Sequence, residues 1–313
     1  MWKRPHNIGL HFLLISGFIA LSLKAQDVPI RVDTHLVTIP VAVRDRDGRH
    51  LTDLKRGDFL ISDNGINQEV AFFESVDAPF TVFLLLDRSN SMTELMTELD
   101  NAVNTFVGQL RPDDQVIAAS FANDVDVLIQ VTKVSNLETI IRVRKHSDDT
   151  HTMLYDAVGY SLKKLRKVQG RKAIILFSDG VGSGILASFK ENLRDAEESE
   201  AAIYTVQFYP FSEGPKFNSK ERFFETINTA NTYMKALPSV TGGRSFRIEE
   251  ISDLKSTFSE IAKELGQQYS LGYYPKDPGK KGERRQIKVR VTIAGAAVRA
   301  RASYIVGSTR GKR

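Results

Sequence analysis

A chain of 313 residues, of which 42% are hydrophobic and 26% charged, is long enough for two folded units and too apolar to be disordered. The absence of cysteine excludes disulfides, a lipid-anchoring cysteine and thiolate metal sites. Three basic residues and no acidic ones lie within the first 25 positions. Without them the chain has 40 basic against 38 acidic residues, a balance that gives no support to nucleic-acid binding.

The first 25 residues have the layout of a secretory signal peptide. Lys3 and Arg4 precede an apolar run over 8–23, and Ala25 stands at the expected cleavage position. The run is about 16 residues long, whereas a spanning helix needs roughly 20, so we expect cleavage; retention as a membrane anchor is the alternative. The prediction is an exported protein, periplasmic or secreted, without a membrane span after signal removal.

Residues 26–79 have the pattern of short β-strands. Apolar and polar residues alternate over 37–43, a turn follows at 45–48, and Asn64-Gly65 indicates a hairpin. A further strand is predicted over 69–73. We therefore expect an N-terminal β segment.

From residue 80 to residue 265 apolar runs alternate with helical periodicity. Continuous apolar runs, typical of buried parallel strands, occupy 82–86, 116–121, 173–177 and 203–208, and a shorter strand is predicted at 245–248. Helical spacing occupies 91–111, 154–165, 186–198, 223–237 and 252–265. This alternation predicts an α/β domain with a doubly wound, mostly parallel sheet.

After residue 265 the β pattern returns. Strands are predicted over 269–274, 286–293 and 298–305, which makes 266–306 a C-terminal β segment and 307–313 a tail. The simplest architecture is an α/β domain inserted in, or flanked by, a small β-sandwich-like unit. That the two β segments pair with each other is a hypothesis.

Polar residues gather at the predicted strand ends, where doubly wound sheets bind ligands. Asp87, Ser89 and Ser91 follow the first apolar run, Asp179 follows the run at 173–177, and Thr152 precedes a helix. Carboxylate and hydroxyl oxygens favour Mg²⁺, with Mn²⁺ or Ca²⁺ as alternatives, over zinc or copper. Each residue alone is also typical of a turn or a helix cap, so the prediction depends on their convergence.

Three segments resemble von Willebrand factor A (VWA) domains. The sequence DRSNS at 87–91 resembles the D-x-S-x-S signature, TMLYDA at 152–157 the T-x-L-Y-D-A segment, and LFSDG at 176–180 the second aspartate loop. The flanking segments YSLGYYP at 269–275 and VRARASY at 298–304 resemble an exported bacterial subfamily best known from acidobacteria.

The resemblance implies a metal-ion-dependent adhesion site. Ser89, Ser91 and Thr152 would coordinate Mg²⁺ directly, and Asp87 and Asp179 would hold it partly through water. A Glu or Asp of a partner protein would take the open coordination position.

The chain departs from the family pattern at 148–151, where DDTH replaces the glycines that the family often has. Thr150 could therefore replace Thr152 as the ligand, and the two carboxylates could tighten the ion or repel an acidic partner. Arg88 and Asn90 either contact the partner around the ion or are solvated loop positions.

The predicted function is an exported, metal-dependent protein-binding module. One alternative is a structural or accessory subunit of an envelope assembly whose metal only stabilises the fold; a metal-dependent hydrolase or phosphotransferase is the other. We expect no enzyme activity, because the sequence has no nucleophile elbow and no P-loop. Phosphotransfer at Asp87 would also require a second acid where Ser89 stands.

Overall fold

The computed structural model describes residue 2 and residues 36–147, 149–208 and 220–307. The predicted signal peptide lies outside the described residues except for Trp2, and the predicted tail lies outside them except for Gly307. Within the described part of the chain, no helix is both long and apolar enough to cross a membrane.

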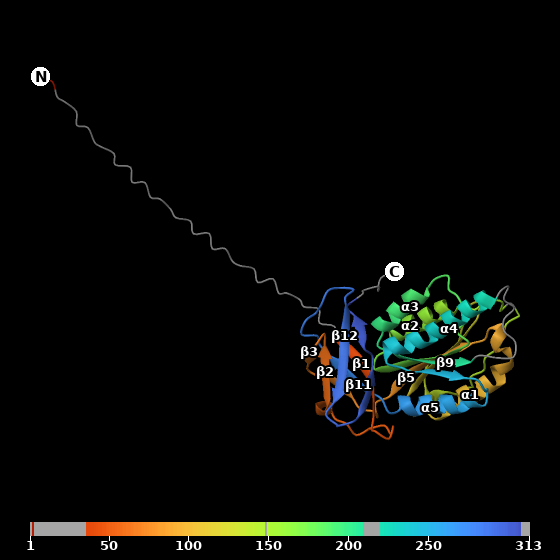
Figure 1. Ribbon diagram of the computed structural model, residues 1–313, viewed down its shortest axis with the longest axis horizontal. Coiled ribbons are helices and arrows are strands. Elements are labelled where there is room, and N and C mark those ends of the chain that lie inside the picture. The colour runs from red at the N-terminus through yellow and green to blue at the C-terminus, as the bar shows by residue number, and fades with distance from the viewer. Residues whose placement is uncertain (1, 3–35, 148, 209–219, 308–313) are drawn as a thin grey trace. The chain divides into compact units, whose positions relative to one another are not determined.

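A six-stranded sheet forms the centre of the α/β domain (Figure 1). Its strands, in sheet order, are β10 (Ser245–Ile248), β9 (Ala202–Phe208), β8 (Arg171–Ser178), β5 (Phe80–Asp87), β6 (Gln115–Phe121) and β7 (Val125–Lys133). Neighbours are parallel except for the antiparallel pair β6–β7. The predicted mostly parallel α/β fold is confirmed, and β7 is a strand that the sequence analysis missed.

Helices cover both faces of this sheet (Figure 1). The helices α1 (Met96–Gly108) and α5 (Asp253–Leu265) cover one face, and α2 (Leu154–Leu165), α3 (Phe189–Glu198) and α4 (Lys220–Thr241) cover the other. Val82 and Leu84 of β5 pack with the first group, whereas Phe83 and Leu85 pack with the second. Because successive side chains point to opposite faces, burial on both faces requires the continuous apolar run that β5 has.

Three short 3-10 helices complete the helical structure of the described residues: η1 (Arg56–Asp58), η2 (Asn90–Leu95) and η3 (Val134–Asn136). The predicted helix over 91–111 therefore begins as η2 and becomes α-helical only at Met96. This places Ser91 on a tight turn rather than inside an α-helix.

The two β segments form a sandwich of two four-stranded sheets. One sheet has the order β13 (Ala297–Ala300), β1 (Val37–Arg44), β11 (Tyr269–Tyr273), β4 (Phe72–Glu74), and the other β14 (Ser303–Ile305), β12 (Arg284–Val291), β2 (Phe59–Asp63), β3 (Ile66–Gln68). β1 pairs with β11 and β13, and β2 pairs with β12, so the hypothesis that the segments pair is confirmed. The single strand predicted over 298–305 is wrong, because β13 and β14 belong to different sheets.

Glu264, near the end of α5, joins the sandwich to the α/β domain. Its buried carboxylate receives Arg44 and Arg299 from the sandwich, and Arg244 and the hydroxyl of Tyr204 from the α/β domain. Burial alone would raise the pKa of Glu264, but the positive charges and the hydrogen bonds hold it below its ordinary value. Glu264 therefore links the sandwich to the α/β domain through ion pairs and hydrogen bonds of its ionised carboxylate.

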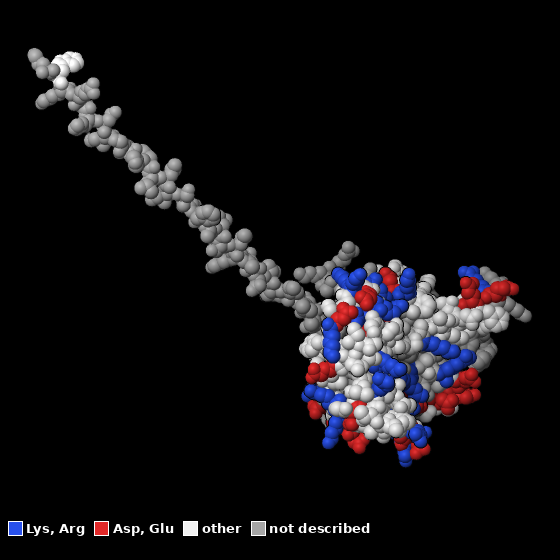
Figure 2. Space-filling model, turned by 60° about the vertical axis from the view of Figure 1, so that its left-hand side comes forward, with Lys and Arg blue, Asp and Glu red and all other residues white. Residues whose placement is uncertain are grey.

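Surface charge agrees with the near balance of basic and acidic residues in the sequence. On the face shown in Figure 2, Lys and Arg side chains are interspersed with Asp and Glu rather than gathered by sign. This face has no basic patch of the kind that binds nucleic acid.

Candidate metal centre

Asp87 lies at the carboxyl end of β5, in the middle of the six-stranded sheet, and is fully buried. Its Oδ1 accepts the backbone N–H of Ser89 at 2.8 Å, and its Oδ2 accepts the hydroxyl of Ser178, the last residue of β8, at 2.6 Å. The parallel register of β5 and β8 brings these two strand ends together.

Ser89, Ser91 and Asp179 surround the same point. The hydroxyl oxygens of Ser89 and Ser91 lie 3.2 Å apart, and Ser91 donates to Asp179 Oδ2 at 2.7 Å. Ser89 and Asp179 are buried, whereas Ser91 is exposed. The structure thus brings together four of the five predicted ligands, in a site that opens to the surface at Ser91.

The backbone conformation of Gly180 orients the carboxylate of Asp179. Its φ of +83° is strained for residues with side chains, and a Cβ there would lie 2.8 Å from Cγ of Met234 on α4. The N–H of Gly180 donates to Ser178 Oγ, and that of Val181 donates to Asp179 Oδ1. The resulting tight turn directs Asp179 toward Ser91.

Thr152, the fifth predicted ligand, is partly buried and reaches this region through its backbone. Its carbonyl accepts the N–H of Ser183, on the loop after Asp179, at 2.9 Å. No hydrogen bond within the described residues joins its hydroxyl to the other four residues. The hydroxyl of Thr150 lies 2.9 Å from Nδ1 of His151 on the exposed surface.

Asp87 and Asp179 lack a cationic partner in the part of the chain that the structure describes. Burial, and next the charge of Asp179, raise the pKa of Asp87 to about 7, and burial also raises the pKa of Asp179. Among the described residues, no Lys or Arg forms an ion pair with either carboxylate. An arrangement of two buried acids and neutral hydroxyl oxygens fits a hard divalent cation, because such an ion supplies the missing positive charge.

Both sequence interpretations of Arg88, as a contact to the partner or as a solvated loop position, are wrong. The side chain is fully buried. Its Nε lies 3.0 Å from Asp149 Oδ2, one Nη lies 2.6 Å from Asp124 Oδ1, and the other lies 3.3 Å from Asp126 Oδ2. Asp149 therefore faces Arg88 and not the centre at Asp87. Asp148 lies outside the described residues.

Asp124, His146 and Asp149 form a second group of potential ligands that sequence analysis missed, with ligand atoms within 4.8 Å of one another. The guanidinium of Arg88 contacts all three, including His146 Nδ1 at 3.3 Å. Burial would raise the pKa of Asp149, but hydrogen bonds from Arg88 and from the N–H of His146 lower it. This group already holds a cation that belongs to the protein.

The family comparison agrees with this geometry. Residues 82–181 match the von Willebrand factor type A domain family. The α/β domain therefore has a VWA-like fold. Modules of this type are commonly used in protein interaction and adhesion. The matched range includes all five predicted ligands and the Arg88 cluster. No curated protein matches the sequence.

Solved structures similar to the chain include further VWA proteins. The ArnB paralog VWA2 from Sulfolobus acidocaldarius is 15% identical, with a TM-score of 0.43, over 87% of this chain and 75% of that one. A von Willebrand factor type A protein from Catenulispora acidiphila is 10% identical, with a TM-score of 0.43, over 88% and 75%. The vWF domain of the type V pili tip protein Mfa5 from Porphyromonas gingivalis is 12% identical, with a TM-score of 0.43, over 60% and 95%.

Proposed function

We propose that the chain is an exported protein-binding module that holds one divalent cation, Mg²⁺ before Mn²⁺ or Ca²⁺, at Asp87, Ser89, Ser91, Thr152 and Asp179. The observation that carries this proposal is the pair of buried carboxylates, Asp87 and Asp179, which share a site with hydroxyl oxygens and have no Lys or Arg partner among the described residues. The ion supplies positive charge there. A Glu or Asp of a partner protein completes its coordination from the open side at Ser91.

The loop after Asp179 supports a protein partner. Ile185 and Leu186 are 81% and 89% exposed, yet their backbone N–H groups both donate to the carboxylate of Asp156 at 2.9 Å, and that of Ala187 donates to it at 2.7 Å. The loop is thus held in place while two large apolar side chains project into solvent. Adjacent apolar side chains on an ordered surface are typical of a protein contact.

Calorimetric titration tests the metal site. Wild type and Glu69→Ala, which removes an exposed acid on the sandwich, should bind Mg²⁺ and Mn²⁺ with the same affinity. Asp87→Ala should show no saturable binding, because the remaining carboxylate cannot balance the dication. Equal binding by wild type and Asp87→Ala would contradict the proposal.

Capture of partners from an envelope extract tests the protein-binding function. The chain should retain a partner in Mg²⁺ and lose it in EDTA, and the double variant Ile185→Ser, Leu186→Ser should weaken retention without changing Mg²⁺ affinity. A partner retained equally in EDTA would instead support the alternative in which the metal only stabilises the fold.

A further inference from the structure

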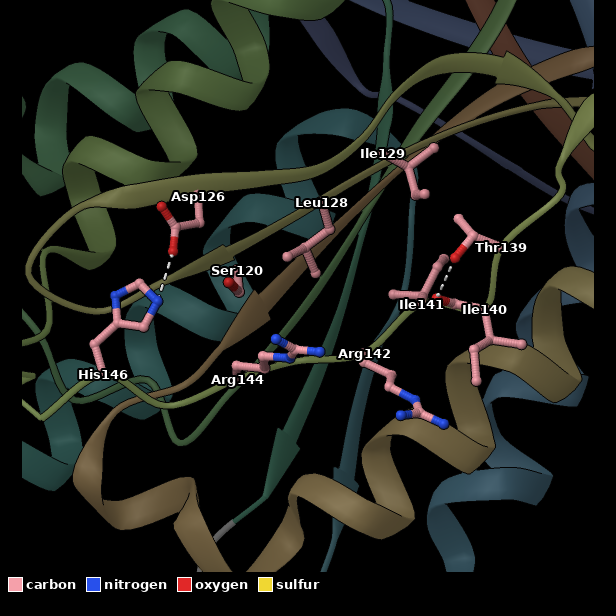
Figure 3. Close-up of a pocket in the computed structure, with 10 residues that line it drawn as sticks. All are labelled: Ser120, Asp126, Leu128, Ile129, Thr139, Ile140, Ile141, Arg142, Arg144 and His146. Carbon is pink, nitrogen blue, oxygen red and sulfur yellow. Dashed lines mark hydrogen bonds and ion pairs between the residues drawn. The ribbon is translucent and has the colours of Figure 1, made fainter.

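A cavity of about 430 Å³ lies along β7, the edge strand of the six-stranded sheet (Figure 3). One wall is formed by Leu128 and Ile129 of β7, and the other by residues 139–142, Arg144 and His146. None of the five proposed metal ligands lines it. The volume is within the range of about 300–1,000 Å³ that is typical of small-molecule sites.

Helix α1 fixes the second wall. Asn104 donates to the carbonyl of Ile141 at 2.7 Å and accepts its N–H at 2.9 Å, and Asp100 accepts the N–H of Val143 at 2.8 Å. Ile141 and Val143 are buried. Arg142 and Arg144, by contrast, are exposed, and both line the cavity.

The charged side chains that line the cavity differ in whether they already have a partner of opposite charge. Arg144 has no hydrogen bond or ion pair with the described residues, whereas Arg142 has the charge of Asp100 nearby. The acid that lines the cavity, Asp126, already contacts an Nη of Arg88 at 3.3 Å and Nε2 of His146 at 3.1 Å. Figure 3 shows this Asp126–His146 pair at one end and the guanidinium of Arg144 in the middle, below Leu128.

Besides the charged groups, the lining contains the polar residues Ser120 and Thr139 and four apolar side chains. Leu128, Ile129 and Ile141 form the inner surface, and Ile140 is 59% exposed at the far end from His146 (Figure 3). A small inorganic anion would contact Arg144 and leave the exposed Ile140 and the partly exposed Leu128 in water. An anion with an apolar body would cover them, which is favourable because apolar surface leaves water.

We propose that this cavity binds a small organic carboxylate, with its carboxylate on the guanidinium of Arg144 and its aliphatic or aromatic body against Leu128 and Ile140. Arg is suited to this contact because its planar guanidinium can donate two parallel hydrogen bonds to a carboxylate. The site is separate from the proposed metal centre, and its occupation does not require the ion.

Titration of the full chain with phenylacetate tests the proposal, in EDTA so that the metal centre does not contribute. Phenylacetate should bind saturably, and the neutral phenylethanol should bind about tenfold more weakly, because it lacks the charge that Arg144 recognises. Arg144→Ala should weaken phenylacetate binding by a similar factor, and Arg144→Lys by less. Ile140→Ser should also weaken it, since part of the apolar wall is lost.

Arg290→Ala is the matched control, because Arg290 is exposed on the sandwich strand β12 and its loss changes the net charge equally. Its affinity for phenylacetate should equal that of wild type. Equal binding of phenylacetate and phenylethanol, unchanged binding in Arg144→Ala, or no saturable binding at all would overturn the proposal. Inorganic phosphate bound as tightly as phenylacetate would overturn the assignment of an organic ligand.

Discussion

Two groups of acidic side chains lie next to each other, one around Asp87 and one around the adjacent Arg88. They differ in how their negative charge is balanced. Asp87 lies close enough to Asp179 for the charge of Asp179 to raise its pKa, and the next residue, Arg88, donates hydrogen bonds to Asp149. The pKa of Asp87 is raised to about 7, first by burial and then by Asp179, whereas the Arg88 hydrogen bonds lower the pKa of Asp149 against the effect of burial. Among the described residues, the second group therefore contains its own cation, whereas the first group contains none, and the metal ion proposed above would balance its charge.

Removing the internal cation should have the largest effect. Arg88→Met leaves Asp149 buried without its partner, so we expect the free energy of unfolding to fall by about 3–5 kcal/mol. Chemical denaturation measures this, with the exposed Arg290→Ala expected to stay within about 0.5 kcal/mol of wild type. Wild-type stability in Arg88→Met would contradict the role of Arg88 as the cation that balances Asp149.

A smaller effect is expected at the group without an internal cation. Because the pKa of Asp87 rises from 3.8 to about 7 on folding, the folded state binds the proton more tightly, and stability without metal should fall as pH rises through this window. At pH values above it, Asp87→Asn should therefore be more stable than wild type in EDTA.

Added Mg²⁺ should act on the group at Asp87. The ion should stabilise wild type above neutral pH and leave Asp87→Asn unchanged, as thermal denaturation with and without EDTA would show. If wild type in EDTA became more stable with rising pH over this window, the two acids would not lack a cation.

The smallest effect is expected at the rim of the Arg88 cluster. Asp124 contacts Arg88 at 2.6 Å, but its side chain is 68% exposed, and Asp149 remains as a buried partner of Arg88. Asp124→Asn should lower the free energy of unfolding by less than about 1 kcal/mol. A loss as large as that of Arg88→Met would show that the exposed pair, rather than the buried one, holds the cluster together.

Much of the fold could be predicted because burial leaves a direct trace in the sequence. The run at 82–86 became β5, and the periodicity at 154–165 became α2 with the same bounds. β7 left no such trace, because it lies at the sheet edge with most of its side chains partly or fully exposed. The break between β13 and β14 was also missed, since their side chains continue one alternating pattern.

The candidate site shows the same division. Asp87 and Asp179 could be placed together because parallel strands bring their carboxyl ends to one edge. Arg88 could not be placed, because its position between two predicted ligands suggests a solvated loop, and its partners Asp124 and Asp149 lie 36 and 61 residues away. The pairing of each acidic side chain with a basic one depends on tertiary contacts, which cannot be predicted from the spacing of residues along a short segment of sequence.

The pairing of β1 with β11 and β13 has a mechanical consequence. The α/β domain leaves the sandwich after β4 and returns to it at β11, and these two strands are themselves paired. Tension applied between residues 36 and 307 is therefore carried by the strands of the sandwich, and the domain that holds Asp87 lies outside the loaded path. A pull on the proposed metal centre, by contrast, reaches the sandwich through both connections at once, with the Arg44 and Arg299 contacts to Glu264 resisting separation.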